Sequence, residues 1–214
     1  MKKFPAIASL TLALLTACRP DPGYTPQAGD LLFQVAADGA FSDAIVTATA
    51  QRDSLQFSHV AIVAVAEDGT PYVVEASSRC GVARTAWDTF FAASQPVSGH
   101  PGVVAMRVTE RDFPVAEAVA RAETHIGEAY DWSFRPDNGS LYCSELVYES
   151  FRRADGSPLF TARPMNFRAA DGHMPAFWTE LFDRLGEPIP EGIPGTNPND
   201  LAKEPVLQEV WRFF

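Results

Sequence analysis

Cys143 combines a nucleophilic side chain with a position that favours its ionised form. It stands in the segment LYCSELV, residues 141–147. The apolar residues after it recur at helical spacing, which predicts a largely buried helix over 143–153 with the thiol in its first turn. The free N–H groups and the dipole of a helix N-terminus stabilise a thiolate and could also bind the oxyanion of an acyl-transfer step. A buried structural cysteine is the alternative.

A thiolate enzyme needs a base, and His59 is the strongest candidate among four histidines. It lies in the apolar run FSHVAIV, residues 57–63, which predicts a buried strand, where a polar side chain requires a partner. Glu75, in the apolar segment YVVEA at 72–76, is such a partner. In a Cys-His-acid triad the carboxylate holds one imidazole nitrogen while the other nitrogen takes the thiol proton.

His59 and Glu75 can meet only in one strand register. Asp68-Gly69 predicts a hairpin turn between the two segments. A two-residue loop centred on that pair puts the two side chains on opposite faces, whereas a shift by one residue pairs His59 with Ser77 and sets Glu75 diagonally beside it. The hypothesis therefore requires the shifted register.

The remaining cysteines bear on this hypothesis. Cys80 lies five residues beyond Glu75, and a disulfide between Cys80 and Cys143 would silence the nucleophile. No cysteines or histidines are spaced like metal ligands, so we expect neither a metal site nor a cofactor.

Length and composition limit the classes of protein that remain. The chain has 214 residues, of which 46% are hydrophobic and 21% charged, as expected for one globular domain. The formal net charge of -10 argues against a nucleic-acid partner, because phosphates need lysine and arginine. The same charge leaves no basic patch for anionic lipid.

The N-terminus has the features of an export signal. Lys2 and Lys3 precede an apolar stretch over 4–15, and the segment LTAC, which ends at Cys18, resembles the bacterial lipobox. We expect residues 1–17 to be removed, Cys18 to be lipidated, and 18–28 to form a tether to a single domain over 29–214. Arg19 favours the outer membrane, with the domain in the periplasm. An ordinary secretory signal is the alternative.

Hydrophobic patterning predicts a small mixed sheet with helices around it, which is an α+β fold. Expected strands cover 31–35, 57–65, 71–76 and 102–108, and the tail 205–214 is expected to add a strand or a cover. Expected helices cover 43–52, 85–93, 113–126, 143–153 and 175–185, the first capped by Ser42 and the third by Asp112.

Five segments together resemble the permuted, YiiX-like branch of the NlpC-type papain-fold hydrolases. They are GDLLF at 29–33, SHVAIV at 58–63, VEA at 74–76, YDW at 130–132 and YCSELV at 142–147. The resemblance covers about residues 28–210 and implies a circularly permuted papain-like fold in which the histidine and the acid precede the cysteine.

The resemblance also implies a cysteine amidase or peptidase with the triad Cys143, His59 and Glu75. Tyr130 matches a tyrosine that lines the site in such enzymes, although a core aromatic residue would fit there equally. Tyr142 and Ser58, next to the cysteine and the histidine, are the other residues expected to contact substrate.

The sequence is compatible with three functions. Hydrolysis of a small peptide or amide, such as a murein fragment or an amino-acid amide, is the leading one. A thiol acyltransferase or lipid deacylase is the second, and an apolar cleft would favour it. The cleft residues expected for that function are Trp87, Phe90, Phe91, Phe177 and Trp178. The third is a catalytically silent binding module of the cell envelope.

Overall fold

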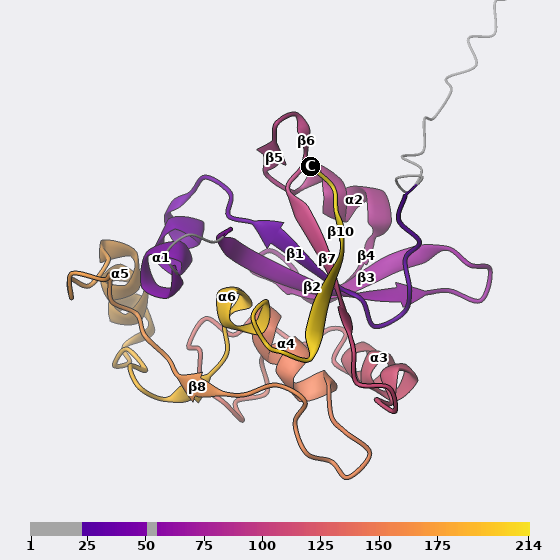
Figure 1. Ribbon diagram of the computed structural model, residues 1–214. Coiled ribbons are helices and arrows are strands. Elements are labelled where there is room, and N and C mark those ends of the chain that lie inside the picture. Colours follow the sequence, from indigo (N-terminus) through magenta and orange to yellow (C-terminus); the bar gives the residue numbers. More distant parts are fainter. Residues whose placement is uncertain (1–22, 51–54) are drawn as a thin grey trace, which may run out of the picture.

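A six-stranded antiparallel sheet forms the centre of the molecule (Figure 1). The computed structural model describes residues 23–50 and 55–214. The strand order is β10-β7-β1-β2-β3-β4, and every neighbouring pair is antiparallel. Its strands are β1 (Leu31–Val35), β2 (Phe57–Val65), β3 (Pro71–Ser77), β4 (Gly81–Ala86), β7 (Val103–Val108) and β10 (Leu207–Arg212). Two short pairs join β5 (Pro96–Val97) to β6 (His100–Pro101), and β8 (Arg163–Pro164) to β9 (Pro194–Gly195).

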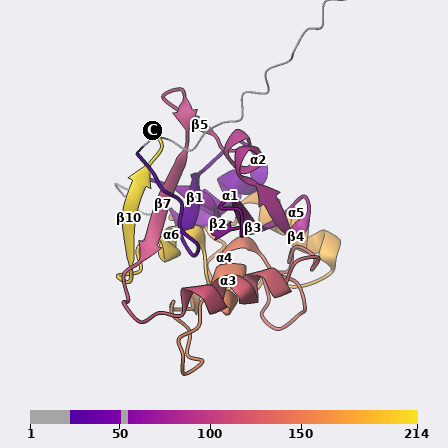
Figure 2. The same ribbon diagram turned by 90° about the vertical axis from the view of Figure 1, so that its right-hand side faces the viewer.

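Helices surround this sheet, so the expected α+β class is confirmed. The helices of the described residues are α1 (Ala40–Thr49), α2 (Trp87–Ala92), α3 (Val115–Thr124), α4 (Cys143–Ser150), α5 (Ala176–Leu185) and α6 (Pro198–Leu201). Figure 2 shows α3 and α4 together beneath the sheet. No helix within the described ranges is long and apolar enough to cross a membrane.

The two faces of the sheet are buried by different elements because side chains alternate along each strand. Phe33, Ile62 and Val74 point into a core that also contains the apolar residues of α3 and α4. The intervening residues of the same strands point to the other face. There they pack with Phe90 of α2 and with Phe213 near the C-terminus.

The strands β1 and β2 have the predicted bounds, but β4 was not predicted. The helix expected to begin at Thr85 begins at Trp87, because Thr85 pairs with Val73 in the sheet. Gly81 makes β4 possible. Its φ of 69° turns the chain back after β3, and a Cβ there would lie 2.2 Å from the carbonyl oxygen of Glu128.

Both helix caps expected from the sequence are wrong. Ser42 lies inside α1, which begins after Gly39, a residue at φ 140° that only glycine adopts without strain. Asp112 lies outside α3, because Pro114 disfavours helical geometry at the residue before it and the helix starts only at Val115.

A buried carboxylate fastens the N-terminal segment to the sheet. Asp30 is fully buried, and Arg107 donates to it from Nε at 2.6 Å and from Nη2 at 2.8 Å. Tyr24 donates its hydroxyl to the same carboxylate at 2.6 Å and stacks on Trp87. The described part of the segment expected as a tether, residues 23–28, therefore includes a buried anchor. Residues 1–22, with the expected signal and Cys18, lie outside the described residues.

We expect Asp30→Asn to lower the free energy of unfolding by about 3 kcal/mol, because it leaves the Arg107 guanidinium with a neutral partner in a largely buried site. Urea unfolding of the purified domain measures this change. Glu209→Gln is a matched control, because it neutralises one partner of the exposed Arg212–Glu209 pair, and it should cost less than about 1 kcal/mol. Equal effects of both substitutions would contradict the assignment.

Candidate active site

The register of β2 and β3 is the one that the triad hypothesis requires. Ile62 pairs with Val74 and Val65 with Pro71. Continued by three residues, the same register sets His59 opposite Ser77, so that Glu75 lies diagonally beside His59 on one face. The two side chains are in contact, with His59 Nε2 2.5 Å from Glu75 Oε2.

A bulge in β2 lies at the histidine. Gln34 of β1 pairs with His59, but the next residue, Val35, pairs with Phe57, so that Ser58 is the extra residue. Phe57 and Val60 consequently point into the same core although three positions separate them. A bulge bends a strand and redirects its side chains, and here it breaks the alternation of faces across Ser58 and His59.

The thiol of Cys143 lies at the first position of α4, as the sequence predicted. Leu146 and Val147 bury this helix against the sheet, which fixes the position of its N-terminus. The thiol itself is buried, at 5% exposure. The unpaired N–H groups of the first turn point away from the helix body, where they can stabilise negative charge on sulfur or on a substrate oxygen.

The imidazole of His59 joins the carboxylate to the thiol. Burial lowers the pKa of His59, but hydrogen bonds to Cys143 and Glu75 and the charges of the same two groups outweigh burial and raise it to about 10. For Glu75, burial has the opposite effect and raises the pKa. The hydrogen bond with His59 outweighs burial, so that the pKa of Glu75 lies below its usual value. Because Nε2 faces Glu75, the other ring nitrogen is the one available to the thiol.

Tyr130 lies beside this triad, and its hydroxyl keeps its proton. Burial, followed by the charges of Cys143 and Tyr142, raises the pKa of Tyr130 well above its usual value. The following residue, Asp131, is buried and accepts hydrogen bonds from the backbone N–H groups of Ser133 and Arg135. This loop holds Tyr130 in a backbone bridge to Leu141, two residues before Cys143.

Glu145 is a polar residue near the thiol that sequence reasoning did not single out. It lies in the first turn of α4 and is buried. Burial, and then the charge of Asp131, raise the pKa of Glu145 to about 8. This carboxyl therefore keeps its proton to a higher pH than an exposed glutamate does, which reduces its repulsion of a thiolate at Cys143. Its place in the apolar YCSELV segment is the signal that could have identified it.

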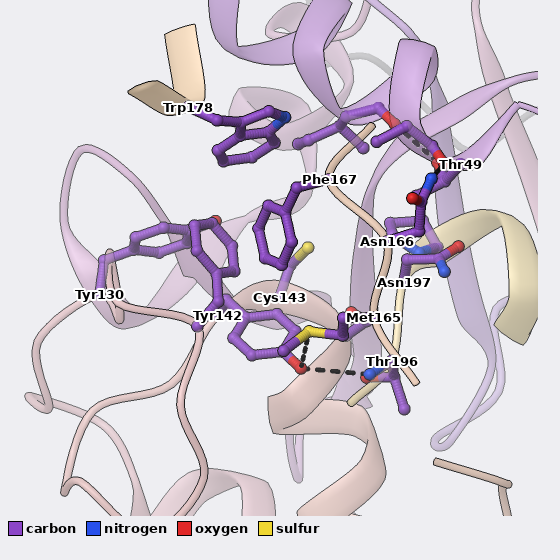
Figure 3. A pocket seen from close by; sticks show the side chains of 15 residues that line it. Thr49, Tyr130, Tyr142, Cys143, Met165, Asn166, Phe167, Trp178, Thr196 and Asn197 are labelled. Carbon is purple, nitrogen blue, oxygen red and sulfur yellow. Dashed lines mark hydrogen bonds between the residues drawn. The ribbon is translucent and has the colours of Figure 1, made fainter. Parts of the chain in front are cut away.

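Two hollows flank the triad. Cys143 and Tyr142 line a small apolar pocket of about 60 Å³, which Figure 3 shows with the Cys143 sulfur among its lining side chains. His59, Glu75 and Ser58 line a larger and more polar hollow of about 850 Å³. Tyr130 lines both hollows. All of the expected catalytic and substrate-contact residues that the structure describes therefore line these two adjoining hollows.

The apolar pocket is built from other residues than the sequence suggested. Trp178 lines it, and Phe90 lines the polar hollow beside His59. Trp87 and Phe91 instead pack with the N-terminal segment, and Phe177 lines neither hollow. The pocket instead takes apolar side chains from α1 and from loops distant in sequence. These are Ile45, Ala48, Phe134, Met165, Phe167 and Pro198.

Both described cysteines are free thiols. Cys80 is exposed and Cys143 is buried, and no disulfide joins them. The bridge that would silence the nucleophile is therefore not formed in this structure.

The order of the histidine, the acid and the cysteine along the chain indicates the class of protein. The histidine and the acid come from β2 and β3, and the cysteine helix follows more than sixty residues later. This is the arrangement of a papain-like hydrolase whose chain is circularly permuted. The model of the permuted papain-like amidase family C92, which includes YaeF and YiiX, matches residues 25–211. The chain belongs to that family.

Two relatives agree with this membership. The YiiX protein of Escherichia coli strain K12 is 28% identical over an alignment of 211 positions, which covers 96% of this chain and 96% of that protein. The crystal structure of the metalloprotein YiiX from Escherichia coli O157:H7 is 27% identical, with a TM-score of 0.69, and covers 88% of this chain and 98% of its own. The expected permuted papain-like fold is thereby confirmed.

The word metalloprotein in that description raises the question of a metal in this chain. Over residues 23–50 and 55–214, no group of three or more His, Cys, Asp or Glu side chains is placed to hold an ion. The donor side chains of these residues therefore do not fit a metal site.

We expect the His59 imidazole to titrate near pH 10 in the folded protein, far above its usual 6.5, because burial, which lowers the pKa, is outweighed by the interactions with Cys143 and with Glu75 that favour the charged form. Its contribution to stability should be full below pH 6.5 and be lost as the pH rises toward 10. Imidazole ¹H–¹⁵N spectra across pH measure the midpoint, and the signal missing in His59→Gln assigns it.

The Glu75→Gln variant separates the two contributions. It removes the carboxylate but keeps the side-chain volume, so the midpoint of His59 should fall. A wild-type midpoint at or below 6.5, or a midpoint unchanged in Glu75→Gln, would contradict the ion pair.

Proposed function

We propose that the protein is a cysteine amidase or peptidase that works through a thiol acyl-enzyme. The observation that supports the proposal is the position of His59, which contacts Glu75 through one ring nitrogen and lies close enough to Cys143 for that group to raise its pKa. A carboxylate that orients an imidazole beside a thiol is the arrangement that activates cysteine for attack on an acyl carbon.

The reaction then proceeds in two stages. The sulfur of Cys143 attacks the amide carbon, a C–S bond forms, and the carbonyl electrons move to its oxygen. The first N–H groups of α4 and the Tyr130 hydroxyl stabilise this oxyanion. Its collapse breaks the C–N bond, and His59 gives its proton to the leaving amine. Water, deprotonated by His59, then attacks the thioester, and the acid leaves as the Cys143 thiol is restored.

The two hollows support one orientation of the substrate. The acyl group becomes bonded to Cys143, which lines the apolar pocket, and the leaving amine must receive its proton from His59, which lines the polar hollow. An apolar acyl group on one side and a polar amine on the other therefore suit the site. Cell-wall peptides and amino-acid amides with an apolar acyl residue are substrates of this kind.

A thiol acyltransferase or lipid deacylase is the second candidate, and the apolar pocket favours it. The first half of the reaction is the same in both functions, and only the acceptor of the acyl group differs. A water acceptor makes a hydrolase, whereas an alcohol or amine acceptor makes a transferase.

Hexanoyl p-nitroanilide tests the acyl-enzyme directly. We expect release of p-nitroaniline and, after acid quenching, a hexanoyl adduct on the Cys143 peptide in mass spectra. Cys143→Ala and His59→Ala should each lower the turnover number by about 10³-fold or more, because each removes a member of the triad. Tyr130→Phe should lower it by about 10²-fold if its hydroxyl binds the oxyanion.

Controls separate the three functions. The adduct should persist in Cys80→Ser, which removes the exposed thiol. Excess ethanolamine in the assay diverts the acyl group from hexanoate to the amide if the protein is a transferase. A wild-type protein that forms no adduct with any acyl donor, and whose Cys143 resists iodoacetamide, would be a silent binding module.

For its location, we propose that the protein is lipid-anchored in the bacterial envelope through Cys18, at the outer membrane and facing the periplasm. The signal-like start and the LTAC segment support this location. Two or three acyl chains would hold it firmly. We expect the full chain to incorporate an alkynyl palmitate and to fractionate with membranes, and Cys18→Ser to lose both properties. Membrane fractionation of Cys18→Ser would contradict the anchor.

A further inference from the structure

The apolar pocket beside Cys143 contains buried polar atoms that have no hydrogen-bond partner. They are Ser144 Oγ, Trp178 Nε1 and Thr196 Oγ1, in residues that are 0%, 2% and 7% exposed. A buried polar atom without a partner destabilises the folded state, so native proteins seldom keep one without a reason. These atoms are themselves covered, so a ligand can bond to one only after its side chain turns toward the pocket, which the hydroxyl of Ser144 or Thr196 can do by rotation about one bond. Three such atoms in residues that line one pocket point to a ligand that supplies a missing bond.

Other polar side chains of the same pocket are fully engaged. The Thr49 hydroxyl donates to the carbonyl of Ile45 at 2.8 Å and accepts from Asn199 at 2.8 Å. Asn166 donates to the carbonyl of Ala48 at 2.7 Å. Asn197 accepts from the backbone at 2.9 Å as the cap of α6. These groups stabilise the fold itself, and the unpaired atoms are therefore not a general property of the pocket.

Tyr142 adds a donor next to Thr196. Its hydroxyl accepts from the Thr196 backbone N–H at 3.2 Å, and its own proton faces only the Met165 sulfur at 3.9 Å, a weak acceptor (Figure 3). Burial raises the pKa of Tyr142 above its usual value, so the proton stays in place. The proton can turn to a better acceptor when one enters the pocket.

The available groups are donors without charge. The indole of Trp178 can only donate, and the hydroxyls of Tyr142, Thr196 and Ser144 can all donate. No acidic or basic side chain lines the pocket. A carboxylate would therefore lack a cation, whereas a neutral oxygen would find donors. We propose that the acyl group bound here is apolar but carries a neutral oxygen, a hydroxyl or a keto group, and that Thr196 selects it.

The inference rests on the proposed function, because the acyl group is assigned to this pocket by the bond that it forms with Cys143. Binding can nevertheless be measured without turnover. Cys143→Ala protein is titrated calorimetrically with hexanamide and with its 3-, 4-, 5- and 6-hydroxy derivatives. We expect at least one hydroxylated amide to bind about three- to tenfold more tightly than hexanamide, as one additional hydrogen bond provides.

Matched variants identify the selecting residue. In the Cys143→Ala background, Thr196→Val removes the hydroxyl at constant shape and should abolish the preference, whereas Thr196→Ser keeps the hydroxyl and should retain it. Thr49→Val removes a hydroxyl from the same pocket that is already paired, and the ratio of the two affinities should stay as in the parent.

The outcomes are distinct. Hexanamide that binds as tightly as every hydroxylated amide, a preference that survives Thr196→Val, or no binding of any probe overturns the inference. A preference that disappears in Thr196→Val supports it even if the wild type cleaves no anilide, in which case the proposed function fails alone. Cleavage of the anilide without any preference for oxygen leaves the proposed function intact and the inference refuted.

Discussion

The contact between His59 and Glu75 is the interaction on which the site depends. A histidine and a glutamate inside an apolar hairpin each cost free energy when alone, and each removes that cost for the other. Their side-chain exposures of 18% and 11% leave little access for water to replace either partner. The pairing of β2 with β3 therefore has one acceptable register, since a slip by one residue would separate two buried polar groups. The register that brings His59 and Glu75 into contact is therefore also the register that leaves neither of these side chains without a partner.

The position of Cys143 depends on a second, independent constraint. Cys143 reaches the imidazole because α4 is buried along its length against the sheet, which leaves its first turn at a defined place. The bulge at Ser58 is the complementary adjustment on the strand side. Neither α4 nor the bulge alone forms the site. A permuted chain can build the same site because the helix and the hairpin meet through packing, and the order in which they are synthesised does not enter that contact.

The sequence predicted the parts of this structure that depend on local pattern. The apolar run of β2 and the helix start at Cys143 are strong local signals, and both were found where expected. The bounds of α1 and α3 were misjudged because Gly39 and Pro114 act through backbone conformation, which outweighed the capping residues nearby. The strand β4 was missed because it is held by its ladder with β3 and has no apolar run of its own.

The pocket could not be predicted, since helices distant in sequence and loops without periodicity contribute to it together. Phe167 and Thr196 lie in loops that approach Cys143 only in the folded chain. Of the aromatic residues that did attract attention, Trp87 packs in the core with the N-terminal segment, and Phe90 lines the polar hollow beside His59. Hydrophobicity indicates that a residue is buried but not on which side of a sheet it is buried, and only the strand register decides that.

The buried anchor at Tyr24 has a consequence for how far the domain can travel. Tyr24 is hydrogen-bonded to Asp30 and stacked on Trp87. The chain is therefore attached to the folded domain only six residues after Cys18. Six residues reach at most about 20 Å when fully extended. With a lipid on Cys18, this short segment would keep the domain close to the bilayer surface. Its reach would then favour substrates that lie in the membrane or adjacent to it over those deeper in the surrounding space.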